Sequence, residues 1–210
     1  TEDIYVGYRY FETFCPEKVL YEFGFGLSYT DFDIEILKAE TNTSGKEIRI
    51  AVRVKNTGND KGKEVVQAYV QAPQGALGKP ARELKAFAKT KELEPGEVQQ
   101  LTLDIPVSSL ASYDDSGVTG HRSCYVLEAG NYIFHVGNSV RHTQIADVDQ
   151  KGGLKIEELC VTETLQEALA PEKPFQRIRP VKTGKGEIYE IAKEDVPQKT
   201  VDLKVRIKEN

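Results

Sequence analysis

The sequence of 210 residues contains no methionine and no tryptophan. Because position 1 is not methionine, we expect the chain to be a piece of a longer protein. The lack of tryptophan argues against a free-standing carbohydrate-binding module, since such modules stack sugar rings on exposed aromatic faces. Cysteine is also scarce. Cys15, Cys124 and Cys160 are odd in number and have no metal-ligand spacing, so we expect buried or half-buried free thiols.

The sequence also lacks any long apolar stretch and any strongly basic run. No segment approaches the roughly 20 apolar residues that cross a bilayer, and the N-terminus does not resemble a signal peptide. The net charge of −5 argues against nucleic acid as a partner. We therefore expect a globular domain with no membrane or nucleic-acid partner and no cofactor. The free cysteines favour a cytoplasmic location.

Residues 31–140 show the pattern of short, half-buried strands. Apolar residues alternate with charged ones over 47–55, a turn follows at 56–60, and 65–70 reads as the next strand. A second alternating strand follows the turn at 93–96. Regular short strands separated by turns predict an antiparallel β-sandwich, so the fold class is mainly β.

Further local structure is expected around this core. Tyr125–Leu127 and Tyr132–Val136 flank a turn and predict a hairpin with His135 on its solvent face. The aromatic residues of 4–10 suit a strand buried on both faces. The stretch 156–170 fits either a helix or a strand, with the strand favoured, and 201–207 alternates as an amphipathic strand.

Several segments carry a family resemblance when they are taken together in this order. They are residues 3–12 (DIYVGYRYFE), 19–30 (VLYEFGFGLSYT), 54–59 (VKNTGN), 62–70 (GKEVVQAYV), 79–87 (KPARELKAF), 110–114 (LASYD) and 127–137 (LEAGNYIFHVG). The series resembles the late part of a glycoside hydrolase family 3 enzyme of the β-glucosidase type. It corresponds to the end of the family's α/β sandwich domain and the fibronectin-III-like domain after it.

The resemblance implies three parts. Residues 1–30 would end an α/β sandwich domain, and 31–140 would form a fibronectin-III/immunoglobulin-like β-sandwich. Residues 141–210 would be a partly irregular extension or linker that leads to a downstream (β/α)8 barrel, as in the family's permuted arrangement. The expected partners are the missing α/β and barrel domains, with a homodimer left open.

The resemblance also implies chemistry that lies outside this sequence. In the family a barrel Asp is the nucleophile and a Glu of the α/β domain is commonly the acid/base, acting with retention on terminal β-linked glucose. The nucleophile's Ser-Asp-Trp-type setting requires a tryptophan, so we assign no catalytic residue. We expect an architectural portion of a β-glucosidase that is inactive alone and whose full enzyme acts on short β-glucosides. A β-xylosidase and a carbohydrate-binding or protein-interaction module remain alternatives.

Two groups of residues are candidate sites. The first is a loop that would reach the rim of a neighbouring pocket, formed by Ser109, Tyr113, Asp114, Asp115 and His121. Within it, the two adjacent aspartates could be a catalytic pair or turn residues that accept hydrogen bonds from backbone amides.

The second group is a domain junction. It consists of Tyr8, Arg9, Tyr10, Phe23 and Phe25. Arg9 lies between aromatic residues and could stack on them or pair with a carboxylate. We identify no metal site, because His121, His135 and His142 lack ligand spacing and 147–152 reads as a polar turn.

Overall fold

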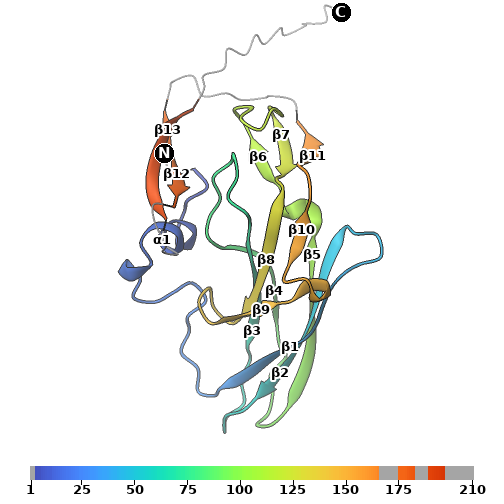
Figure 1. Ribbon diagram of the computed structural model, residues 1–210. Helices are drawn as coiled ribbons and strands as arrows, with labels where there is room; N and C mark the ends of the chain where they lie inside the picture. The colour runs from blue at the N-terminus through green and yellow to red at the C-terminus, as the bar shows by residue number, and fades with distance from the viewer. Residues whose placement is uncertain (1–2, 166–174, 183–188, 197–210) are drawn as a thin grey trace, which may run out of the picture.

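The computed structural model describes residues 3–165, 175–182 and 189–196 (Figure 1). The helices are α1 (Tyr8–Phe14) and the short 3-10 turns η1 (Pro16–Lys18), η2 (Val107–Leu110) and η3 (Val148–Gln150). The strands are β1 (Phe32–Thr41), β2 (Glu47–Asn56), β3 (Val65–Gln71), β4 (Glu83–Lys89), β5 (Val98–Pro106), β6 (Ser112–Asp114), β7 (Cys124–Leu127), β8 (Gly130–Gly137), β9 (Thr143–Ala146), β10 (Leu154–Ile156), β11 (Cys160–Thr164), β12 (Gln176–Val181) and β13 (Glu190–Asp195).

Two antiparallel sheets enclose the main core. One has the order β1-β2-β5, and the other has the order β10-β8-β3-β4 with β9 also paired to β8. The inward residues of β2, from Ile48 to Val54, are fully buried, and Ile50 lies opposite Leu103 of β5. They pack with Val66, Tyr132 and other buried residues of the second sheet. The predicted antiparallel sandwich is therefore confirmed, and alternation along the strands is what selects the buried face.

The predicted hairpin between 125–127 and 132–136 is wrong. β7 pairs with β6 and β11 in a separate three-stranded sheet, whereas β8 pairs with β3, β9 and β10. Between them, the Glu128 side chain turns toward the loop at 73–80, and Gly130, at φ 140°, starts the strand in the other sheet. Only glycine adopts such a φ readily, so the turn residues mark a change of sheet.

The expected burial of two side chains is also wrong. His135 is only 7% exposed, on a strand that pairs with β3 and β9. Its imidazole Nε2 lies 3.2 Å from Oε1 of Gln71. Cys15 and Cys124 are buried free thiols as predicted, but Cys160 is exposed on β11, which ends its sheet.

The N-terminal stretch forms a helix where a strand was expected. Gly7, at φ 57°, precedes α1, and the amide of Phe11 donates to the Gly7 carbonyl. Tyr10 and Phe14, four residues apart on one helix face, have ring centroids 5.3 Å apart. The aromatic density therefore belongs to a helix, which with Tyr5 packs against Ile178 of β12.

The sheets continue beyond residue 140. β9 and β10 both pair with β8, so residues 143–156 lie in the same sheet as the preceding strands. β11 is a strand, as favoured for this part of 156–170. The remainder, 166–170, and the predicted strand at 201–207 lie outside the described residues. Within the described part of the chain, no helix is long and apolar enough to cross a bilayer.

Candidate functional site

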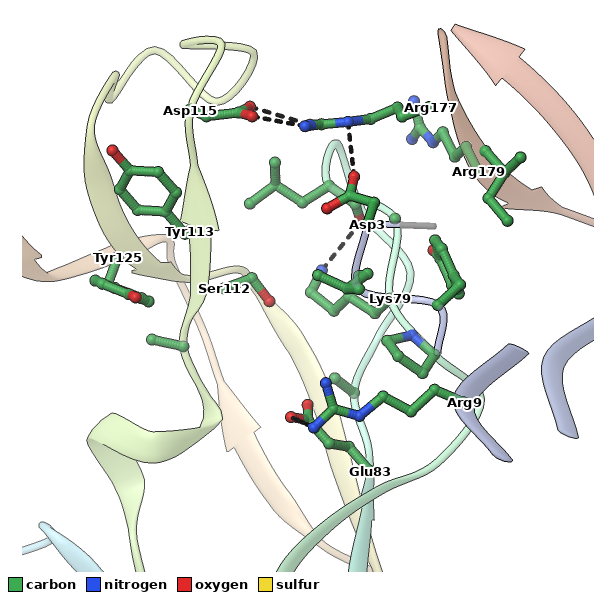
Figure 2. Close-up of a pocket in the computed structure, with 18 of the residues that line it drawn as sticks. Asp3, Arg9, Lys79, Glu83, Ser112, Tyr113, Asp115, Tyr125, Arg177 and Arg179 are labelled. Atoms are coloured by element: carbon green, nitrogen blue, oxygen red, sulfur yellow. Dashed lines mark hydrogen bonds and ion pairs between the residues drawn. The ribbon is translucent and has the colours of Figure 1, made fainter. Parts of the chain in front are cut away.

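A cavity of about 290 Å³ lies where four separate segments of the chain meet (Figure 2). Its walls come from the N-terminal stretch 3–9, the loop between β3 and β4, the stretch 110–118 and strand β12. It is completed by single residues of β3, β7 and β13 and by two residues of β4, namely Val70, Tyr125, Glu194, Glu83 and Lys85. These segments are distant in sequence, so the cavity depends on the N-terminal helix and the β12–β13 hairpin packing onto the sandwich.

Arg177 of β12 spans one wall. Its two terminal nitrogens donate to the two carboxylate oxygens of Asp115, at 3.0 and 2.6 Å. Its Nε lies 3.1 Å from Oδ2 of Asp3, as an ion pair without the alignment of a hydrogen bond. Burial alone would lower the pKa of Arg177, but the hydrogen bonds that it donates to Asp115 and the charges of Asp3 and Asp115 raise it. The bridge thus joins the N-terminal stretch, β12 and the loop after β6.

The loop at 73–80 forms the opposite wall and is fixed by a buried ion pair. Lys79 binds Glu128, and its Nζ also donates to the carbonyls of Pro73 and Leu77 at 3.0 and 3.3 Å. Glu128 accepts the amide of Ala76 at 2.6 Å. Burial lowers the pKa of Lys79, and the hydrogen bond to Glu128 opposes that shift. All donors of the ammonium are used, so this wall is structural.

Two tyrosines line the third wall. Tyr113 of β6 lies directly opposite Tyr125 of β7 in the sheet register, and their rings lie 5.2 Å apart at 48°. Both side chains remain partly exposed, at 38% and 36%. Figure 2 shows them across the cavity from Asp3 and Lys79, with the Arg177–Asp115 pair above and the Arg9–Glu83 pair below.

The predicted rim loop is brought only partly to this cavity. Tyr113 and Asp115 line it, whereas Ser109, Asp114 and His121 do not. Ser109 accepts a hydrogen bond from Lys85 through its carbonyl at 2.8 Å, and His121 is exposed.

Asp114 accepts hydrogen bonds from the turn that follows it. Its side chain is fully buried and accepts the amides of Gly117 and Thr119, at 2.7 and 2.8 Å, and the Thr119 hydroxyl at 2.6 Å. Burial would raise the pKa of Asp114, but these hydrogen bonds outweigh it and hold the pKa below its usual range. Of the two alternatives for the adjacent aspartates, the backbone-capping role is the one that Asp114 adopts.

Sequence reasoning missed most of the cavity. Tyr5, Lys79, Tyr125, Arg177 and Arg179 line it and were not predicted. Tyr125 had a detectable signal, because a strand pairing of 112–114 with 124–127 would place it beside Tyr113. The residues of β12 had none, since nothing local reveals which surface a distant hairpin covers.

Of the predicted junction residues, Tyr8 and Arg9 contact strand β4 of the sandwich. The Tyr8 ring stacks on Phe23 at 4.6 Å, and its hydroxyl accepts the amide of Leu84 in β4 at 2.8 Å. Arg9 pairs with Glu83 at 3.0 Å. Of the remaining two, Tyr10 packs on α1 neighbours and the ring of Phe25 lies 4.8 Å from that of Tyr21.

The segment after η1 leaves large apolar side chains uncovered. Tyr29, Leu27 and Leu20 are 96%, 94% and 91% exposed. We define the aromatic strip as this segment's exposed apolar residues, Leu20, Tyr21, Phe23, Phe25, Leu27 and Tyr29. A groove beside it is lined by residues 22–28 and by Phe87 of β4, itself 68% exposed.

Comparisons with known proteins agree with this architecture. Residues 64–140 match the family described as fibronectin type III-like domain. The chain is 44% identical over 205 residues to a β-glucosidase of Ruminococcus albus, which covers 98% of this chain and 20% of that protein. The chain matches the fibronectin-III-like part of the family 3 β-glucosidases. It is also 49% identical over 162 residues to β-glucosidase A of Butyrivibrio fibrisolvens, covering 70% of this chain and 19% of that protein.

Solved structures show the same relation. The crystal structure of a β-glucosidase from Paenibacillus barengoltzii superposes with a TM-score of 0.92 at 56% identity, over 96% of this chain and 22% of that one. β-Glucosidase 3B of Thermotoga neapolitana, in complex with glucose, superposes with a TM-score of 0.64 at 42% identity. The match covers 76% of this chain and 20% of that one. The chain thus spans about a fifth of the length of the relatives it matches.

Proposed function

We propose that this chain is the non-catalytic, architectural portion of a family 3 β-glucosidase that hydrolyses terminal β-linked glucose with retention. The observation that carries the proposal is the aromatic strip, whose six large side chains are between 44% and 96% exposed. Large apolar side chains exposed in this number along one segment mark a docking site or an aggregation hazard. The α/β and barrel domains are the occupants we propose, since about four fifths of the matched relatives lies outside this chain.

The acidic residues of the cavity support a non-catalytic role. Retaining hydrolysis needs two carboxyl groups about 5 Å apart, one to attack and one to exchange a proton. Both oxygens of Asp115 accept from Arg177, and Asp3 pairs with the same guanidinium. Carboxylates bound in this way are not free for attack or proton transfer.

The direct test is an activity assay of the purified 210-residue chain with p-nitrophenyl β-glucoside and p-nitrophenyl β-xyloside. We expect no release of nitrophenol above the buffer rate. Turnover that copurifies with the chain and falls in Asp3→Asn or Asp115→Asn would contradict the proposal. Loss of the fold in these variants is checked by circular dichroism, and Asp33→Asn on the exposed face of β1 is the matched control.

A further inference from the structure

The charged residues that line the cavity neutralise one another. Each of its five cationic side chains has an acidic partner within 4 Å, in the pairs Arg9–Glu83, Lys85–Glu83, Lys79–Glu128, Arg177–Asp3 with Asp115, and Arg179–Glu194. A charged ligand would have to displace one of these partners. A neutral ligand with many hydroxyl groups would instead add hydrogen bonds to charged donors and acceptors, which are the stronger class.

The cavity lining includes a residue whose buried hydroxyl has no hydrogen-bond partner among the described residues. Tyr5 is only 3% exposed and lines the cavity, and its hydroxyl has no hydrogen-bond partner among the described residues. The hydroxyl lies beside Gly78, where an added Cβ would approach it to 2.9 Å. Burial raises the pKa of Tyr5, so the group stays protonated and can both donate and accept. A buried hydroxyl without a partner costs free energy, which a bound ligand would recover.

Two aromatic rings, tilted by 48° to each other, also line the cavity. The Tyr113 and Tyr125 rings are partly exposed at the cavity, and such rings stack on the apolar face of a sugar ring. The volume of about 290 Å³ is at the small end of ligand pockets, which run from roughly 300 to 1,000 Å³. This size suits one ring more than an extended chain.

We propose that this cavity binds a neutral pyranose, with Tyr113 and Tyr125 stacking on its ring and the Tyr5 hydroxyl hydrogen-bonded to one of its hydroxyl groups. The partly exposed Arg9–Glu83 and Arg179–Glu194 pairs provide further hydrogen bonds. All the residues that line this site belong to the described part of this chain. It would hold sugar in the architectural part of the enzyme, and the inference does not depend on hydrolysis.

The test is a titration of the 210-residue chain with glucose, xylose, cellobiose, sorbitol and inorganic phosphate, followed by NMR shifts of the backbone amides. We expect saturable binding of at least one pyranose in the millimolar range, with shifts at residues 76–79 and 112–116. Sorbitol, which has the hydroxyls without the ring, should bind at least fivefold more weakly.

Two variants and a control separate binding from folding. Tyr113→Ala removes half of the stacking surface and should weaken pyranose binding about tenfold. Tyr5→Phe deletes only the unpartnered hydroxyl, so it should weaken binding at least threefold while Tm stays the same or rises. Tyr29→Ala, on the 96% exposed residue outside the cavity, should change neither quantity.

Four results would overturn the proposal. They are no saturable shift with any pyranose at 50 mM, equal binding of sorbitol, binding of phosphate alone, and pyranose binding that Tyr5→Phe and Tyr113→Ala leave unchanged. Because the readout is binding to the isolated chain, these results are independent of whether the full enzyme proves to be a β-glucosidase.

Discussion

His135 is a buried imidazole in the middle of the second sheet. Burial, and secondarily the positive charge of Arg82, lower the pKa of His135 to about 4. In the unfolded chain the imidazole of His135 takes up a proton near pH 6.5, whereas in the folded chain it stays neutral until about pH 4. The contribution of His135 to the free energy of unfolding should therefore be complete above pH 6.5. It should fall by up to about 3 kcal/mol as the pH drops toward 4.

Urea unfolding between pH 7 and pH 4 measures this prediction. His135→Gln keeps a polar partner for Gln71 but does not titrate, so its stability should fall less steeply over the same window. An equal slope in the two proteins would show that the imidazole is not the group responsible. His121→Gln, on an exposed histidine, is the control.

Asp114 is the acidic residue for which the structure gives the clearest structural role. Asp114→Ala leaves the amides of 116–119 without their shared acceptor, and we expect a loss of roughly 2–4 kcal/mol in the free energy of unfolding. Thermal and urea denaturation measure it, with Asp33→Asn as the exposed control. A loss below about 0.5 kcal/mol would mean that the buried carboxylate does not hold this turn.

At the scale of the element, the loop at 73–80 depends on the Lys79–Glu128 pair. Removing one partner leaves the other as a buried charge without a counter-ion. Glu128→Gln and Lys79→Met should therefore each lower the free energy of unfolding by about 3–5 kcal/mol. The double variant should cost less than the sum of the two, because it leaves no unpaired charge. A double-mutant cycle by urea unfolding checks this, and additive losses would contradict it.

Strand patterns explain which elements could be predicted from the sequence. β2 and β5 each bury one face, so alternation identifies them and their orientation. β8 is paired on both edges, and its inward and outward sides are both covered, which is why alternation misplaced His135. Residues 4–10 were predicted as a strand because a dense run of aromatic residues is compatible with both a strand buried on two faces and a helix. In the structure, helix α1 begins directly after Gly7.

At the scale of the whole molecule, the family resemblance could be predicted, but the cavity could not. The motifs between residues 3 and 137 predict the β-sandwich and the resemblance to the matched relatives. The cavity requires β12 to lie against Tyr5 and Asp115, and no local pattern around Arg177 specifies that contact. Tyr113 and Asp115 were anticipated only as parts of a loop.

The three most exposed residues of the aromatic strip should contribute almost nothing to the stability of the isolated chain. Leu20, Leu27 and Tyr29 are almost fully exposed, so the triple substitution to serine should change the free energy of unfolding by less than about 0.5 kcal/mol. It should also reduce self-association in analytical ultracentrifugation. Leu77→Ser, at a buried position, is the contrasting control and should be strongly destabilising. A large loss in the triple variant would place the strip within the chain's own packing.

The most direct test of the architectural role is the activity of a chimera. The matching segment of the Ruminococcus albus β-glucosidase is replaced by this chain, with or without Leu20→Ser, Leu27→Ser and Tyr29→Ser. The value of kcat/KM is measured with p-nitrophenyl β-glucoside, and Tm is measured by thermal denaturation. We predict that the unmodified chimera is active and that the triple substitution lowers its Tm and reduces active enzyme at least tenfold. An active chimera with the same Tm and kcat/KM after the triple substitution would contradict docking through the aromatic strip.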